Sequence, residues 1–159
     1  MKQKNIYAIA LCVLFFALTG CKKKDKSQDP ETFLSNIAQP TWTVPANYDY
    51  SSSLTAIIKV DIASQYPDRA AGWRIMPEDQ LAAFVGEQCV GVAELHEDLF
   101  YLYITPPNSE NNDGDEITLR YYSAYCKNIF EAWSAFNFVN DDMLGTIIEP
   151  LKPVFTVAK

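Results

Sequence analysis

Hydrophobic and polar residues alternate with a period of two along most of the chain beyond residue 50. In the stretch 54–62, one set of alternate positions is entirely apolar, namely Leu54, Ala56, Ile58, Val60 and Ile62. Successive side chains of a β-strand point to opposite faces, so this pattern predicts a strand with one buried face.

The same alternation recurs in short stretches that are separated by turn residues. We predict further strands at residues 81–85, 89–95, 100–105, 117–125, 129–133, 136–139 and 154–157. Helices are expected only as brief segments, at residues 33–37 or 77–83. Short strands punctuated by Pro and Gly predict an all-β fold, an antiparallel β-sandwich of immunoglobulin-like or jelly-roll type with about seven to nine strands.

The amino-terminal residues predict a signal peptide and a lipid anchor. Lys2 and Lys4 precede an apolar run at residues 6–18, which has the length of a signal-peptide core and is too short to span a bilayer comfortably. The sequence Leu18-Thr19-Gly20-Cys21 at its end resembles the lipobox of bacterial lipoproteins. This resemblance implies a signal peptide at residues 1–20 and a mature protein that is held on a membrane by lipid on Cys21.

Residues 21–31 predict a lipidated, flexible tether, followed by one domain at residues 32–159. Between Lys22 and Glu31 no apolar residue is present that would enter a core. The tether carries four lysines, Lys22, Lys23, Lys24 and Lys26. They either attract anionic headgroups or are simply solvated, and both alternatives stay open. Lys22 directly after the lipidated cysteine is compatible with the outer membrane of the cell envelope, whereas the leaflet stays undetermined.

The charge of the chain is acidic. The formal net charge is −7, and removing the signal peptide with Lys2 and Lys4 leaves 11 basic against 20 acidic residues. From residue 33 onward there are seven basic and seventeen acidic residues. Nucleic acid is therefore excluded as a partner, because its phosphates need clustered Lys and Arg. We also expect the domain to stand off an anionic surface.

Little in the sequence points to catalysis, a metal or a cofactor. The single histidine, His96, lies in a predicted turn, which is a poor place for a catalytic base. The His and Cys residues lack zinc-ligand spacing, and residues 108–116 fail the register of an EF-hand but leave an irregular calcium loop open. We expect no enzymatic activity and no cofactor. Cys89 and Cys126 remain in the domain and are expected to be unpaired core residues, although an exported compartment would permit a disulfide between them and this alternative stays open.

Tyrosines supply the best candidate for a ligand site. If Phe100 and Leu119 point into the core, the alternation places the other residues of their strands on the opposite face. Those residues form the predicted ligand-binding platform: Tyr101, Tyr103, Arg120 and Tyr122. The alternative is an ordinary sandwich exterior, where β-propensity alone enriches Tyr. The tryptophans, Trp42, Trp73 and Trp133, are expected to pack in the core or at its rim.

The stretch 79–93 carries a resemblance to a known module. Asp79, the pair Ala83-Phe84, Cys89 and Gly91 occur in this order, and later positions match at Phe138, Gly145 and Pro150. This pattern resembles a module of secreted and lipid-anchored Bacteroidetes-type β-sandwich proteins, over roughly residues 53–157. The resemblance implies the fold and the compartment, and it carries over no functional residue.

Two functions are consistent with these features. One is a lipid-anchored, non-enzymatic binding or adhesion module of the cell envelope, for a glycan or a protein, and it predicts a face with exposed aromatic residues. The alternative is a structural accessory subunit of an envelope assembly, which predicts a long unpaired edge strand or an apolar patch without a pocket.

Overall fold

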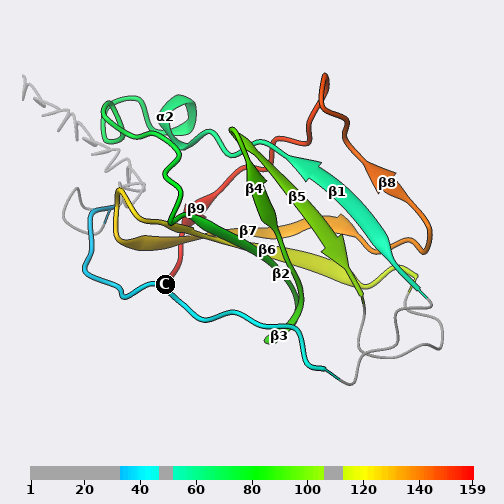
Figure 1. Cartoon of the computed structure of the whole chain (residues 1–159). Helices are drawn as coiled ribbons and strands as arrows, with labels where there is room; N and C mark the ends of the chain where they lie inside the picture. Colours follow the sequence, from blue (N-terminus) through cyan, green and yellow to red (C-terminus); the bar gives the residue numbers. More distant parts are fainter. Residues whose placement is uncertain (1–32, 47–51, 106–112) are drawn as a thin grey trace, which may run out of the picture.

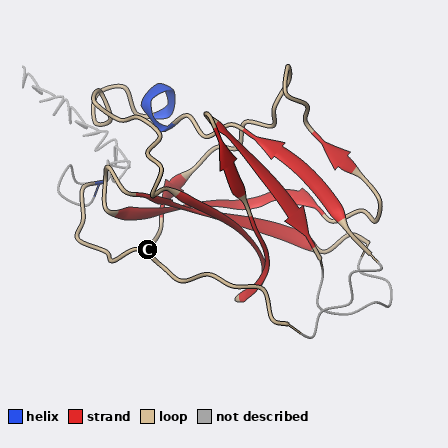
Figure 2. Ribbon diagram, viewed as in Figure 1, coloured by secondary structure: helices blue, strands red, loops and turns tan. Residues whose placement is uncertain are grey.

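The computed structural model describes residues 33–46, 52–105 and 113–159, which form two β-sheets packed face to face (Figure 1). These ranges contain nine strands and the short helix α2 (Ile62–Gln65). Figure 2 shows how completely strands and loops make up the described chain. The prediction of an all-β antiparallel sandwich is therefore confirmed.

Sheet A has four strands, and most of its neighbours are antiparallel. Their order is β4 (Glu94–His96), β5 (Leu99–Ile104), β1 (Leu54–Ile58) and β8 (Met143–Leu144). Only β8 runs parallel to its partner, β1, among the pairs of this sheet.

Sheet B has five antiparallel strands. Their order is β3 (Gln88–Val92), β2 (Gln80–Val85), β6 (Glu116–Ser123), β7 (Asn128–Asn137) and β9 (Thr156–Val157). The pairing of β6 with β7 shifts at a bulge in β7. Ile117 pairs with Phe136 on one side of this bulge, and Leu119 pairs with Ala132 on the other. Ser134 in this bulge has a φ of 46°, which is the left-handed region.

Alternate residues of the central strands fill the space between the sheets. The inward side chains of β5 and β6 are almost completely buried, and they are the ones that the alternation predicted: Phe100, Leu102, Ile104, Ile117, Leu119 and Tyr121. Phe33 joins this core from outside the sheets, with its ring 5.3 Å from that of Phe130. The hydrophobic pattern therefore determines the core correctly.

Several predicted boundaries are wrong. β1 ends at Ile58 rather than at residue 62, because the carboxylate of Asp61 accepts a hydrogen bond from the Ser64 N–H (3.0 Å) and caps α2. The predicted strands 129–133 and 136–139 are parts of one bulged strand, β7. The helix predicted at residues 77–83 does not form, since residues 80–83 belong to β2. Of the helix predicted at 33–37, only Phe33 is helical and residues 34–37 are irregular.

The chain passes from sheet B to sheet A between β3 and β4. Gly91 lies at this crossing, where an added Cβ would be 2.5 Å from the backbone oxygen of Tyr103. The N–H of Thr105 donates a hydrogen bond of 2.9 Å to the Val90 carbonyl and joins β3 to the end of β5. The sheets are thus linked along this edge, and only glycine leaves room for the close approach.

Residues 33–46, which we call the covering segment, lie over the outer face of sheet B (Figure 1). The N–H groups of Ser35 and Ile37 donate to the carbonyls of Cys126 and Lys127, at 3.0 and 2.9 Å. The side chain of Asn128 donates to the Phe33 carbonyl at 3.2 Å. The covering segment is therefore held at the β6–β7 turn. Within the described residues, no helix is long and apolar enough to cross a bilayer.

Candidate functional site

The predicted tyrosine platform is divided between the two sheets. Tyr101 and Tyr103 lie on β5 in sheet A, whereas Arg120 and Tyr122 lie on β6 in sheet B. All four side chains point outward from their strands, as the alternation predicted, but the outer faces of the two sheets look in opposite directions. The prediction of one shared face is wrong, because β5 pairs with β1 and β4 and never with β6.

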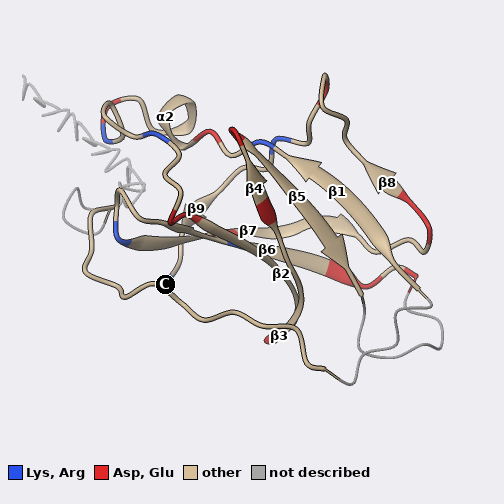
Figure 3. Ribbon diagram, in the orientation of Figure 1, with Lys and Arg blue, Asp and Glu red and all other residues tan. Residues whose placement is uncertain are grey.

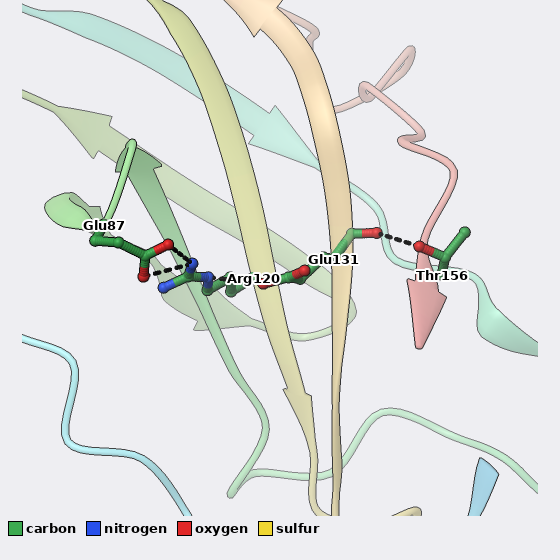
Figure 4. Close-up of polar contacts among 4 residues, drawn as sticks. All are labelled: Glu87, Arg120, Glu131 and Thr156. Atoms are coloured by element: carbon green, nitrogen blue, oxygen red, sulfur yellow. Dashed lines mark hydrogen bonds and ion pairs between the residues drawn. The ribbon is translucent and has the colours of Figure 1, made fainter. Parts of the chain in front are cut away.

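Arg120 is bound by two glutamates on the outer face of sheet B (Figure 4). Its Nε donates to Glu131 at 2.9 Å, and its Nη2 donates to both carboxylate oxygens of Glu87, at 3.0 and 2.9 Å. The guanidinium carbon also lies 4.3 Å from the ring centre of Phe84. The hydrogen-bonding capacity of the guanidinium group is thus engaged in contacts within the protein.

The covering segment closes this face over the arginine. Trp42 packs edge to face against Phe84, with the ring centres 5.8 Å apart. The hydroxyl of Tyr122 donates to the Ile37 carbonyl at 3.3 Å, and the Tyr122 side chain is buried. Tyr122 therefore holds the covering segment in place, and Arg120 is engaged by Glu87, Glu131 and Phe84, so neither is available as part of an open ligand platform.

Within the described part of the chain, the outer face of sheet A stays accessible at Tyr103 and keeps half of the predicted platform. Thr55 on β1 has Tyr103 as its partner on one side and Met143 of β8 on the other. Tyr103 is 47% exposed and Met143 is 65% exposed. Tyr101 lies partly buried on the same face of β5. We call this row of four residues the tyrosine face.

The surroundings of the tyrosine face are polar and weakly charged. The ring of His96 on β4 packs edge to face against Tyr101, with the ring centres 5.3 Å apart. His96 Nε2 also lies 3.4 Å from a carboxylate oxygen of Glu94, and both side chains are exposed. His96 is exposed at the surface, but it is the last residue of β4 rather than part of the turn in which the sequence placed it. The tyrosine face is thus aromatic, with the exposed Glu94 and His96 beside it on β4.

A second apolar feature, which sequence reasoning missed, is the turn at residues 145–150. The N–H of Thr146 donates to the Glu149 carbonyl, and the N–H of Glu149 donates to the Thr146 hydroxyl, both at 2.9 Å. Ile147 and Ile148, at the tip, are 66% and 92% exposed. We call this the isoleucine turn. Figure 1 shows it standing away from the body of the sandwich.

Gly145 places the isoleucine turn at the edge of sheet A. Its φ of 75° favours glycine, and an added Cβ would be 2.6 Å from the Ile57 carbonyl oxygen. The Leu151 N–H then donates to that same carbonyl at 2.9 Å. The chain therefore leaves the strand edge at Gly145 and returns at Leu151. Gly145 and Pro150, which bound two consecutive isoleucines, were the signal in the sequence for this turn.

The tryptophans and the cysteines were also given predicted environments. Trp133 is exposed on the β7 bulge, so the expectation that it packs is wrong, whereas Trp73 packs against the ring of Tyr121 and Trp42 against Phe84. Cys89 and Cys126 are free thiols, as expected. Burial raises the pKa of both thiols, which keeps them protonated and poorly reactive.

No chemistry of metal binding is evident in the part of the chain that the structure describes. There, His, Cys, Asp and Glu residues form no group of three or more that would hold an ion. Most of the candidate calcium loop at residues 108–116 lies outside the described residues, as do the lipid site Cys21 and the tether at 21–31.

Comparison with known proteins does not extend this description. No family model, curated protein or solved structure matches the chain. The geometry itself defines a β-sandwich with one sheet face covered by its own amino-terminal segment and the other face open.

Proposed function

We propose that this protein is a lipid-anchored, non-enzymatic binding module of the cell envelope, whose tyrosine face binds a protein ligand. The observation that carries the proposal is the open row of Tyr103, Thr55 and Met143 across sheet A. Tyr and Met are enriched at protein interfaces, where they bury much apolar area. The anchor on Cys21 and the envelope location come from the sequence alone.

The alternative, a structural accessory subunit of an envelope assembly, predicts a long unpaired edge strand or an apolar patch, and the strand edges do not support it. In sheet A the edge strands β4 and β8 have three and two residues, and β9 in sheet B has two. The longer edge strand, β3, has its Val90 carbonyl already bonded to Thr105. Such short or occupied edges offer little template for an added strand.

The test uses the full chain with Cys21 intact, cross-linked in envelopes and recovered by a tag. We expect Tyr103→Ser to weaken capture of the cross-linked protein by about thirtyfold, the effect of losing a central aromatic anchor worth ~2 kcal/mol. Trp133→Ser, which removes an exposed aromatic residue from sheet B, is the matched control and leaves capture unchanged.

Folding is measured separately for both variants. Loss of one cross-strand pair at Tyr103 costs at most about 1 kcal/mol of unfolding free energy. Equal capture by Tyr103→Ser and the wild type contradicts the proposal. A glycan in place of a protein is recognised by binding to a glycan array that the same substitution abolishes.

A further inference from the structure

The isoleucine turn lies at the same end of the sandwich as the point where the described chain begins. Phe33 packs on Tyr66, with ring centres 5.2 Å apart, and the Tyr66 hydroxyl donates to the Phe155 carbonyl at 2.8 Å. Gln65 of α2 donates to the Pro153 carbonyl at 3.1 Å, shortly after the isoleucine turn ends. We call this the α2 end of the domain.

The length of chain between Cys21 and Phe33 limits how far the α2 end lies from the lipid. An extended chain spans at most about 3.6 Å per residue, so residues 22–32 reach no further than about 40 Å. Phe33 itself is buried and fixed by its contact with Asn128. A lipid on Cys21 is therefore attached through the α2 end, and the intervening chain is long enough that the charge of the domain decides which end faces the membrane.

The two ends of the domain differ in charge (Figure 3). The end opposite α2 gathers five acidic residues, Asp113, Asp115, Glu116, Asp141 and Asp142, and the described residues place no Lys or Arg beside them. Most of the blue ribbon segments, which mark Lys and Arg, lie toward the α2 end in Figure 3, mixed with red ones. Lys59 there is paired with Asp98 at 2.6 Å.

An anionic bilayer repels the acidic end more strongly than the α2 end, where basic residues offset part of the acidic charge. The repulsion acts within about a Debye length of the surface, roughly 8 Å at physiological salt. The expectation that the whole domain stands off an anionic surface is thereby narrowed to one of its ends. The tether lysines favour the same orientation.

From these observations we infer that the isoleucine turn inserts Ile147 and Ile148 into the headgroup region of the bilayer, as a second membrane contact beside the lipid. This inference rests on the lipid anchor of the proposed function. Two isoleucines alone bind a membrane weakly. The anchor makes their contact intramolecular, so a weak contact is populated. The tyrosine face is then held at a fixed orientation to the membrane.

The experiment places a fluorescent reporter at the turn. The full, lipidated chain with Ile148→Cys is labelled with the environment-sensitive dye NBD and reconstituted into vesicles of phosphatidylethanolamine and phosphatidylglycerol. Val139→Cys, at the acidic end, is the matched control, and the labelled wild type corrects for reaction at Cys89 and Cys126. Lipids with a nitroxide near the carbonyl end of the acyl chain quench a dye that lies at the headgroup boundary and leave a dye in water unquenched.

We expect quenching at position 148 to reach about half of the emission or more, since interfacial elements sit ~5–10 Å deep, and position 139 to stay unquenched. Adding Ile147→Asp to the Ile148→Cys chain abolishes the quenching. Replacing phosphatidylglycerol by phosphatidylcholine reduces it in part. Equal quenching at both positions, or none at 148 in a chain that floats with the vesicles, overturns the inference and leaves the anchor intact.

Two other outcomes are distinguished by the same samples. A dye at 148 that stays exposed in vesicles but becomes shielded in native envelopes shows that a protein covers the turn, and this also overturns the inference. A chain that fails to float with vesicles at all contradicts the lipid anchor, and thus the proposed function.

Discussion

The hydroxyl of Tyr121 donates a hydrogen bond to the carboxylate of Asp79 in the interior of the sandwich. Tyr121 is completely buried, and Asp79 is nearly so. The same carboxylate accepts the N–H groups of Ala124 and Met76, at 2.7 and 3.1 Å. One side chain therefore joins the loop before β2 to the end of β6, beside the site where the covering segment begins.

We expect Tyr121→Phe to destabilise the domain by about 1–3 kcal/mol, because a buried carboxylate loses a donor without gaining water. Burial raises the pKa of Asp79 above its ordinary value of 3.8 despite its hydrogen bonds. The folded chain thus holds this proton more tightly than the unfolded chain. Protonation of Asp79 therefore stabilises the folded state fully below pH ~4, and this stabilisation is lost as the pH rises through the pKa of Asp79 in the folded state.

Removing the Tyr121 donor raises the pKa of Asp79 further, so the destabilisation is larger at pH 7 than at pH 4. Urea unfolding at both values measures it. Tyr103→Phe, at an exposed tyrosine, is the control and is nearly neutral at both. A loss of stability for Tyr121→Phe that is the same at pH 4 and pH 7 contradicts the role given to the carboxylate.

The two glutamates bound to Arg120 differ in what they contribute. The Glu131 side chain is 11% exposed and that of Glu87 is 85% exposed. We expect Glu131→Gln to cost about 2–3 kcal/mol of unfolding free energy, since it leaves a largely buried guanidinium with one exposed charged partner. Glu87→Gln costs less than about 1 kcal/mol. Denaturant titrations of the two variants with equal losses would count against a buried Arg120–Glu131 pair.

Gly91→Ala tests the crossing between the sheets. An added methyl group meets the Tyr103 backbone oxygen at 2.5 Å, and we expect this overpacking to cost about 1–3 kcal/mol. Gly86→Ala is the matched variant, because its φ is 56° and no atom lies within 4 Å of an added Cβ. There only the left-handed backbone is strained, at about 1 kcal/mol. Thermal unfolding that is unaffected by Gly91→Ala would mean that the sheets separate easily at this edge.

The alternation of residues predicted faces correctly and strand neighbours incorrectly. Tyr103 and Arg120 were both placed on an outer face, which a period of two determines. Which strand lies beside β5 is decided by backbone hydrogen bonds, and these are nearly independent of side-chain identity. The chain between β5 and β6 crosses to the other sheet, and no pattern within either strand encodes that crossing.

The covering segment and the isoleucine turn were missed for a related reason. Residues 33–46 bury Phe33 and pack Trp42 without a regular period, so no periodic signal marks them. The short helix α2 did carry a signal, since Asp61 precedes Ser64 in a capping arrangement, but the apolar alternation through Ile62 extended the predicted strand over it. Long-range contacts therefore determine the path of the covering segment, and the cap at Asp61 determines where β1 gives way to α2.

The membrane anchor is tested by Cys21→Ser. Lipid on this cysteine is both the anchor and the prerequisite for cleavage, so we expect the variant to keep residues 1–20 and to incorporate no labelled fatty acid. It should also leave the membrane fraction in a high-salt wash, whereas the wild type stays. Cys12→Ser is the matched control: it lies in the segment that is removed, and it should be processed and lipidated normally. Mass spectrometry and fractionation read both results. A Cys21→Ser chain that is cleaved normally and stays with washed membranes means that the anchor lies elsewhere, and the orientation inferred for the isoleucine turn then loses its basis.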